Sequence, residues 1–251
     1  MLFKTTAVLA LVGGVLASPM KRQSSCPGIH VFGARETTAG AGFGSSATVV
    51  NGILSANAGA TSEAINYPAC GGQASCGGAS YSQSVQAGFA AVATAVNNFN
   101  SQCPSTKLVL VGYSQVERPT LDSAPDNGFP KRGHGSEIFD TALCGGGDPN
   151  QGYTNTAVLF SASAVTQIKA AIFMGDPQYV AGLPYNVGTC AAGGFDARPS
   201  GFSCPSASKI QSYCDAADPY CCNGSNDSTH NGYGAEYGAQ AIQFVQSKLS
   251  A

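Results

Sequence analysis

The strongest constraint on the fold is the stretch from Lys107 to Gln115, KLVLVGYSQ, in which an apolar run leads directly into a serine. The run from Leu108 to Val111 is short and partly β-branched, which is typical of a strand buried on both faces of a parallel sheet. A buried strand that ends in Gly-X-Ser-X indicates a nucleophile elbow, a tight strand-to-helix turn that presents the serine hydroxyl. We therefore predict that Ser114 is a nucleophile and that the amide of Gln115 faces the developing oxyanion.

One position of this motif departs from the usual pattern. The second glycine of an elbow stands two residues after the serine and lets the helix and the strand pack closely, but this chain has Val116 there. Residues 116–134, VERPTLDSAPDNGFPKRGH, include six charged residues and three prolines and show no apolar period. Without them Gln115 would join Gly135, and the sequence would again read Gly-Tyr-Ser-Gln-Gly.

Three interpretations of residues 116–134 compete. They could be a lid over the site, or an inserted loop, whose entropic cost rises only slowly with its length. We favour the third interpretation, that they come from an unspliced part of the gene. If the mature protein retains them, we expect that no helix starts directly behind Ser114, that the Gln115 amide loses its fixed direction and that catalysis is slow.

Composition limits the class of protein. At 251 residues the chain is long enough to bury the core of one α/β domain. Only 10% of its residues are charged, the formal net charge is -2, and no run of Lys or Arg is long enough to follow a phosphate backbone. We therefore expect no nucleic-acid partner. The absence of tryptophan argues against an attached carbohydrate-binding module.

The N-terminus has the pattern of a secretory signal. Residues 1–18 contain one lysine, an apolar segment from Ala7 to Val15 and small residues around Ala17, and they are too short to span a membrane. The dibasic pair Lys21-Arg22 indicates a short pro-segment at residues 19–24, which leaves residues 25–251 as a single catalytic domain. No second long apolar run follows, so we expect an extracellular protein without a membrane anchor.

Ten cysteines in a secreted chain predict five disulfides. Spacing does not determine the pairing, although Cys70 and Cys76, and likewise Cys214 and Cys221, are close enough to close local loops. A zinc site is the weaker interpretation, because the spacings are irregular and only three histidines are available. We therefore expect no metal and no cofactor.

Alternating apolar patterns predict a parallel sheet that is covered by helices on both faces. The expected strands are 28–33, 64–67, 108–111, 171–175 and 208–213. The expected helices are 46–56, 84–102, 137–143, 164–170 and 233–249, and the helix 84–102 has the clearest period. The helix 233–249 should bury Tyr237, Ala241, Phe244, Val245 and Leu249. Two glycosylation sequons begin at Asn223 and Asn226, in a loop ahead of this helix.

A serine nucleophile needs a base that takes its proton, and a histidine is the usual choice. His30 lies inside an apolar strand and is better explained as a structural residue, while His134 falls within residues 116–134. His230 lies in a glycine-rich loop ahead of the last helix, in the chain order Ser, Asp, His that α/β-hydrolases use. We therefore predict that His230 is the base.

Three aspartates are candidates for the carboxylate that orients this base. Asp215 and Asp218 both lie between Cys214 and Cys221, after the last predicted strand, and Asp176 follows another strand. Asp218 is favoured because it is nearer the middle of its loop and precedes a proline. Asp215 is the alternative and would otherwise be a turn or surface residue, and Asp176 would otherwise end its strand.

The loop after the first strand, from Ala34 to Thr38, should lie at the edge of the sheet where α/β active sites form. Either Thr37 or Thr38 could supply a second donor to the oxyanion. Both are also ordinary loop residues, so the residues alone leave this choice open.

Six motifs, taken together, carry a family resemblance: IHVFGARETT, INYPACGG, LVLVGYSQ, MGDP, YCDAADPYCC and H-x-GYG. The chain resembles the cutinase and acetylxylan esterase family, carbohydrate-esterase family five, and its secreted acetylxylan esterases in particular. The resemblance covers Cys26 to Leu249 apart from residues 116–134. It implies a cutinase-like α/β-hydrolase fold, a central mostly parallel sheet with helices on both faces.

The resemblance also implies roles for individual residues. Ser114 would be the nucleophile, Asp218 the orienting acid and His230 the base. Thr37 and the Gln115 amide would form the oxyanion hole. The implied disulfides are Cys26–Cys103, Cys70–Cys76, Cys144–Cys204, Cys190–Cys222 and Cys214–Cys221.

The function that the resemblance implies is a secreted serine esterase that removes acetyl groups from acetylated xylan through an acetyl-enzyme. We expect it to act as a monomer. Tyr220 should cap the acyl pocket, because family cutinases generally carry a smaller aliphatic residue at this position. The alternatives are a cutinase that acts on longer aliphatic esters, and an inactive secreted homologue in which residues 116–134 break the elbow.

Overall fold

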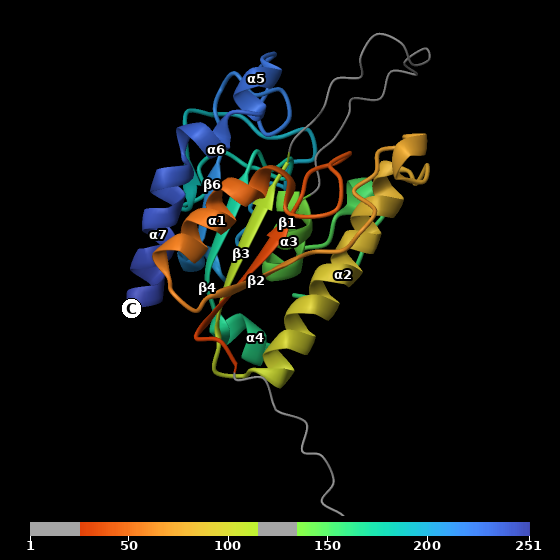
Figure 1. The fold of residues 1–251 in the computed structure, drawn as a ribbon. Helices are drawn as coiled ribbons and strands as arrows, with labels where there is room; N and C mark the ends of the chain where they lie inside the picture. Colours follow the sequence, from red (N-terminus) through yellow and green to blue (C-terminus); the bar gives the residue numbers. More distant parts are fainter. Residues whose placement is uncertain (1–25, 115–134) are drawn as a thin grey trace, which may run out of the picture.

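The computed structural model describes residues 26–114 and 135–251 (Figure 1). Its centre is a six-stranded sheet in the order β2-β1-β3-β4-β6-β5, in which all neighbouring strands are parallel. The predicted α/β fold is therefore confirmed. The signal and pro-segment expected at residues 1–24, and residues 116–134, lie outside the described residues.

The elements follow one another in α/β order. The strands are β1 (Ile29–Ala34), β2 (Thr61–Ala64), β3 (Lys107–Tyr113), β4 (Ile168–Met174), β5 (Asn186–Val187) and β6 (Ile210–Tyr213). The α-helices are α1 (Ala47–Ala56), α2 (Tyr81–Gln102), α3 (Gly135–Cys144), α4 (Ala162–Gln167), α5 (Asp227–His230), α6 (Tyr233–Glu236) and α7 (Gly238–Ser250). The 3-10 helices are η1 (Gly44–Ser46), η2 (Ala74–Cys76), η3 (Pro149–Gln151) and η4 (Ala207–Lys209).

Helices cover both faces of the sheet, with α2 and α3 on one side and α1 and α7 on the other (Figure 1). The central strand β3 shows why both faces must be covered. Leu108 and Leu110 belong to the apolar core under α2 and α3, whereas Val109 and Val111 belong to the core under α1 and α7. All four side chains are buried, so neither face of the strand is exposed to solvent.

Two strand predictions were displaced and one strand was missed. The second strand occupies Thr61–Ala64 rather than 64–67, because residues 61 to 64 pair with β1 in register. The first part of the predicted strand 208–213 belongs to η4, and β6 starts at Ile210. The edge strand β5 has only two residues, which is too short for a periodic pattern to reveal.

Two helix predictions also differ from the structure. The helix predicted at 164–170 ends at Gln167, because Ile168 is already extended and buried in β4. The last helix is interrupted at Tyr237, whose φ of -114° and ψ of -2° separate α6 from α7. Tyr237 and Phe244 are partly buried rather than fully buried, whereas the other three side chains expected on that face are buried.

The first turn of α3 lies directly against the nucleophile strand. A Cβ atom added to Gly112 would lie 2.4 Å from the carbonyl oxygen of Gly135 and 2.7 Å from the Cα atom of Ser136. Such an approach is possible only because residue 112 carries no side chain. The expectation that residues 116–134 remove the helix from behind Ser114 is therefore wrong, since α3 begins there with Gly135.

Five disulfides cross-link the chain, and all ten cysteines are used. They join Cys26 to Cys103, Cys70 to Cys76, Cys144 to Cys204, Cys190 to Cys222 and Cys214 to Cys221, the pairings that the resemblance implies. Because every thiol is oxidised, none is available to bind zinc. Within residues 26–114 and 135–251, no helix has the length and apolar character needed to cross a bilayer.

Candidate active site

The residues expected to act in catalysis lie at the carboxyl ends of the strands. Ser114 directly follows β3, and Gly175 directly follows β4. Asp218 lies in the loop after β6, and His230 is the last residue of α5. In a parallel sheet these strand ends share one edge, so the topology brings together residues that are far apart in the sequence.

Ser114 is fully buried and held by its own backbone. Its amide donates to the carbonyl oxygen of Met174 at 2.9 Å, which extends the pairing of β3 with β4 by one residue. The hydroxyl of Ser136, in the first turn of α3, donates to the same carbonyl at 2.9 Å and accepts from the Met174 amide at 3.1 Å. The nucleophile candidate is thus fixed between β4 and α3.

Asp218 and His230 form a buried hydrogen-bonded pair. The distance from His230 Nδ1 to Asp218 Oδ2 is 2.7 Å, and both side chains are 0% exposed. The other carboxylate oxygen, Oδ1, accepts from the amides of Tyr220 at 2.6 Å and Cys221 at 3.0 Å. Burial by itself would raise the pKa of Asp218, but the bonds from His230, Tyr233 and the Tyr220 amide outweigh it and hold that pKa below the usual value. Asp218 therefore remains a carboxylate.

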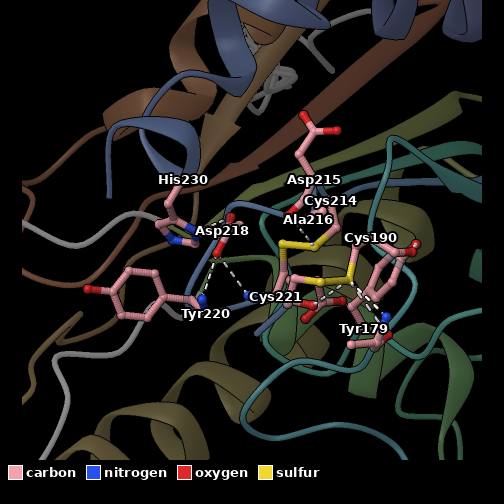
Figure 2. Close-up of a disulfide and its surroundings, with 12 residues drawn as sticks. Tyr179, Cys190, Cys214, Asp215, Ala216, Asp218, Tyr220, Cys221 and His230 are labelled. Carbon is pink, nitrogen blue, oxygen red and sulfur yellow. Dashed lines mark hydrogen bonds and ion pairs between the residues drawn. A yellow bond between two sulfur atoms is a disulfide. The ribbon is translucent and has the colours of Figure 1, made fainter. Parts of the chain in front are cut away.

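Figure 2 shows the His230 ring turned toward Asp218, with the Cys214–Cys221 disulfide closing the loop that carries the carboxylate. A short disulfide loop has few alternative conformations, and two backbone amides already bind Oδ1. The orientation of Asp218 is therefore set before any substrate binds.

His230 and Ser114 meet over Gly175, which has a φ of +66°. A Cβ atom added to this glycine would lie 2.7 Å from His230 Cε1 and 3.1 Å from the carbonyl oxygen of Ser114. The imidazole and the backbone of the nucleophile candidate therefore pack on the same glycine. Among the described residues, neither His230 Nε2 nor Ser114 Oγ has a hydrogen-bond partner, although both atoms are buried.

The other two aspartates have structural contacts of their own. Asp215 accepts from the Tyr237 hydroxyl at 3.0 Å and from the amide and hydroxyl of Thr189, each at 2.9 Å. Asp176 is buried, which raises its pKa, and it accepts from the amide of Gln178 at 3.0 Å. The structure brings Asp218, rather than Asp215 or Asp176, to His230.

His30 is a structural residue, as predicted. It is buried in β1, its Nδ1 lies 2.6 Å from the hydroxyl of Thr61, and its ring stacks on Phe99 with 3.9 Å between centroids. Burial lowers the pKa of His30 to about 4, so the ring is neutral in its pocket. His134 lies outside the described residues.

The loop after β1 is anchored by the two residues that precede the oxyanion candidates. The Arg35 guanidinium donates to the carbonyls of Ile65 and Tyr67, and the Glu36 carboxylate accepts from the amide of Ser45 at 2.8 Å. Thr38 has a φ of +68°, and its amide donates to the carbonyl of residue 69 at 2.7 Å, so that amide is already used.

Thr37 is buried at the site edge of the sheet, and its choice over Thr38 as an oxyanion donor stays a prediction. The second predicted donor, the amide of Gln115, lies outside the described residues. It stays a prediction.

Tyr220 lies beside His230. Its ring centroid is 4.5 Å from that of His230, and its hydroxyl donates to Asp227 Oδ1 at 3.0 Å. This hydrogen bond holds the Tyr220 ring beside the imidazole (Figure 2). The role of Tyr220 in limiting the acyl pocket stays a prediction. The two sequon residues, Asn223 and Asn226, are both exposed. Asn226 also caps α5, since its side chain accepts from the amide of Ser228 at 3.0 Å.

The Cutinase family profile matches residues 25–249 of this chain. The chain belongs to the cutinase family. This confirms the resemblance that the six motifs carry.

Relatives of this cutinase-family protein include acetylxylan esterases. Acetylxylan esterase 2 of Talaromyces purpureogenus is 69% identical over 239 residues, which cover 94% of each chain. A solved acetylxylan esterase structure at 0.90 Å resolution is 71% identical, covers 90% of this chain and 100% of its own, and superposes with a TM-score of 0.82. Cutinase 11 of Verticillium dahliae is 57% identical over 249 residues, 99% of this chain and 78% of the relative.

Two tyrosines of this cutinase-family protein contribute to the site in ways that the sequence analysis missed. The Tyr113 hydroxyl donates to the carbonyl of His230 at 3.1 Å and accepts from the amide of Tyr233 at 3.0 Å. The Tyr233 hydroxyl donates to Asp218 Oδ2 at 2.7 Å. Their positions, one residue before Ser114 and three residues after His230, were the available signal.

Three buried carboxyl groups lie close enough together to be considered as a cation site. Side-chain oxygens of Glu137, Asp148 and Asp196 lie within 4.8 Å of one another. Burial raises the pKa of Glu137 well above its usual value and that of Asp148 to about 6. Glu137 accepts from the hydroxyl of Tyr81, and Asp196 accepts from two side-chain amides. Bound protons and these donors reduce the charge of the cluster, so its stability does not require an ion.

Proposed function

We propose that this chain is a serine esterase that removes acetyl groups from acetylated xylan. The observation that carries the proposal is the buried pair of Asp218 and His230 at 2.7 Å, packed with Ser114 on Gly175. The identity of 69% with an acetylxylan esterase over nearly the whole chain supports the substrate class.

The first half of the proposed reaction acylates the serine. His230 Nε2 takes the proton of Ser114 Oγ, and the oxygen attacks the acetyl carbonyl. Asp218 stabilises the imidazolium that forms, and Thr37 with the Gln115 amide donates to the oxyanion. The imidazolium then gives its proton to the sugar oxygen, which leaves as an alcohol.

The second half releases acetate. His230 takes a proton from a water molecule, which attacks the acetyl-enzyme, and the serine regains its proton when the intermediate collapses. Both halves use only groups of the chain itself, so the proposed mechanism uses no metal or cofactor.

Tyr220 is proposed to select short acyl groups. Its ring lies beside the His230 imidazole and is tethered through its hydroxyl. Each extra methylene that a pocket refuses is worth about 1–3 kcal/mol, so acetate should be favoured strongly only over chains that are longer by several carbons. The relative named Cutinase 11 keeps longer aliphatic esters as a second candidate substrate.

We also propose an extracellular location for residues 25–251 as one catalytic domain that acts as a monomer. Five disulfides support this location, because such bonds form and persist in oxidising compartments. Intact-mass measurement of the exported protein would test the predicted cleavage after residue 24 and the glycans at the two sequons.

The proposed nucleophile is tested by Ser114→Ala, measured with p-nitrophenyl acetate and with acetylated xylan. Loss of the nucleophile should reduce kcat by about 10³-fold or more. Ser247→Ala, at an exposed serine of α7, is the matched control and should keep full activity. A serine-reactive phosphonate should label the parent chain and the control but not Ser114→Ala. Unchanged acetate release by Ser114→Ala would refute the proposal.

A chain that lacks residues 116–134 tests the interrupted elbow. Its Gln115 is joined to Gly135, so we expect it to hydrolyse acetylated xylan faster than the full-length chain. Equal activities would show that residues 116–134 do not disturb the oxyanion donor. Binding to insoluble xylan without phosphonate labelling would instead favour an inactive homologue.

A further inference from the structure

We propose that Tyr233 is a positioning residue of this site, whose hydroxyl competes with His230 for one oxygen of Asp218 and so moderates how strongly the carboxylate holds a proton on the imidazole. The inference rests on the proposed roles of Asp218 and His230. It adds a fourth side chain to the three that carry the reaction.

The competition is visible in the hydrogen bonds to Asp218 Oδ2. The Tyr233 hydroxyl donates to this oxygen at 2.7 Å, and His230 Nδ1 lies at the same distance from it. All three side chains are buried, at 1% exposure or less, so water does not weaken either bond. Two donors on one oxygen each receive less of its negative charge than a single donor would.

The Tyr233 hydroxyl has one strong acceptor, Asp218 Oδ2, because the other acceptor within reach is the disulfide sulfur of Cys221 at 3.4 Å, and sulfur accepts only weakly. The amide of Asp215 donates to its oxygen at 2.9 Å, which occupies one lone pair and polarises the O–H group toward Asp218. Burial, followed by the charge of Asp218, raises the pKa of Tyr233, so the hydroxyl keeps its proton. The bond from the Asp215 amide thus makes Tyr233 a constant donor.

The backbone around Tyr233 is also fixed. Its amide donates to the Tyr113 hydroxyl at 3.0 Å, and the same hydroxyl holds the carbonyl of His230. The Asp215 side chain is hydrogen-bonded to Tyr237 and Thr189, so the Asp215 amide that donates to Tyr233 is held in place.

Several ionisable groups lie in the segments that pack around Asp218. They are Asp215, Asp227, His230, Tyr113, Tyr220, Tyr233 and Tyr237.

Removal of the hydroxyl therefore has a predictable sign. Without Tyr233 as a donor, Asp218 Oδ2 offers its full charge to His230, and the imidazolium becomes more stable. The base then stays protonated to higher pH, and the acid limb of the activity profile moves upward. A purely structural hydroxyl would change stability but would not move this limb.

The test is the pH profile of kcat/KM for p-nitrophenyl acetate in Tyr233→Phe, which keeps the ring. The midpoint of the acid limb should rise by about 0.5–1 pH unit, as expected if about half of the free energy of one hydrogen bond to a charged group passes to the His230 bond. KM should not change, because the Tyr233 hydroxyl binds Asp218 rather than the acyl group. On the acid limb kcat should fall, because the base stays protonated to higher pH. Tyr179→Phe is the matched control, since it removes a buried hydroxyl that donates only to the Cys190 carbonyl, at 3.2 Å. Its limb should stay in place.

A second readout does not depend on catalysis. The proton between His230 Nδ1 and Asp218 should give a low-field NMR resonance, and this resonance should move in Tyr233→Phe but not in Tyr179→Phe. An acid limb and a resonance that both coincide with the parent chain would overturn the inference, and so would a downward shift of the limb. If the parent chain has no activity that Ser114→Ala removes, the proposed function fails, and the resonance alone decides the inference.

Discussion

Substitution of Gly135 by alanine tests whether the first turn of α3 provides the close packing behind the nucleophile. Gly135 is the first residue of α3, and its Cα faces backbone on three sides. An added Cβ would lie 2.4 Å from the carbonyl oxygen of Ala34, 2.5 Å from that of Tyr113 and 2.8 Å from that of Arg35. None of these atoms belongs to a side chain that can rotate away, so β1, β3 or α3 has to move.

The expected cost follows from these contacts. Overpacking in a core typically costs 1–3 kcal/mol, and three backbone contacts below 3.0 Å place this case at about 3 kcal/mol. Alanine regains up to about 1 kcal/mol of helix propensity relative to glycine, so a net loss of about 2 kcal/mol is expected. For a chain of this size that corresponds to a fall in Tm of about 4–8 °C.

Activity should suffer more than stability. Movement of β3 or of the loop after β1 displaces Ser114 and Thr37 together, and a displacement of about 1 Å can cost about 10²-fold in rate. The assay is thermal unfolding followed by hydrolysis of p-nitrophenyl acetate. Gly40→Ala is the control, because an added Cβ there has no atom within 4 Å. If Gly135→Ala matched the control in both measurements, the packing of α3 against β3 would be refuted.

Three further substitutions test other parts of the structure. Gly175→Ala should lower kcat by at least about 10-fold, because its Cβ would lie 2.7 Å from His230 Cε1; an unchanged kcat would contradict the packing at this glycine. The raised pKa values of Glu137 and Asp148 mean that these groups stabilise the fold most below about pH 4 and that the contribution is lost as the pH rises through about 6. Glu137→Gln should therefore flatten the decline in Tm between about pH 4 and 8. An unchanged slope would contradict the raised pKa of Glu137. Tyr220→Ala should raise the rate on butyrate esters relative to acetate esters, and an unaltered ratio would remove this residue from the acyl pocket.

The catalytic candidates could be predicted because their signals are local. An apolar run and a glycine within a few residues indicate Ser114. His230 remains as the candidate base once His30 is explained as a structural residue and His134 falls within residues 116–134. The oxyanion donors were harder to choose, since Thr37 and Thr38 are equivalent in sequence. In the structure the Thr38 amide donates to the carbonyl of residue 69, whereas the choice of Thr37 comes from the family resemblance.

The carboxylate needed the three-dimensional structure for a similar reason. Asp215 and Asp218 lie three residues apart in one disulfide loop, and position in the loop favours one of them only weakly. In the folded chain Asp215 binds Tyr237 and Thr189, while Asp218 binds His230. These partners come from other segments, so no local pattern contains the choice.

Local patterns were enough to predict the α/β order of the elements, the buried character of the central strand and the family, because periodicity and turn residues act over short distances. The packing of Gly135 behind Ser114, and the contacts of Tyr113 and Tyr233 with His230 and Asp218, became visible only in the folded chain. Packing and buried hydrogen bonds depend on which distant segments meet at the edge of the sheet. That meeting is set by the strand order and not by any one stretch of the chain.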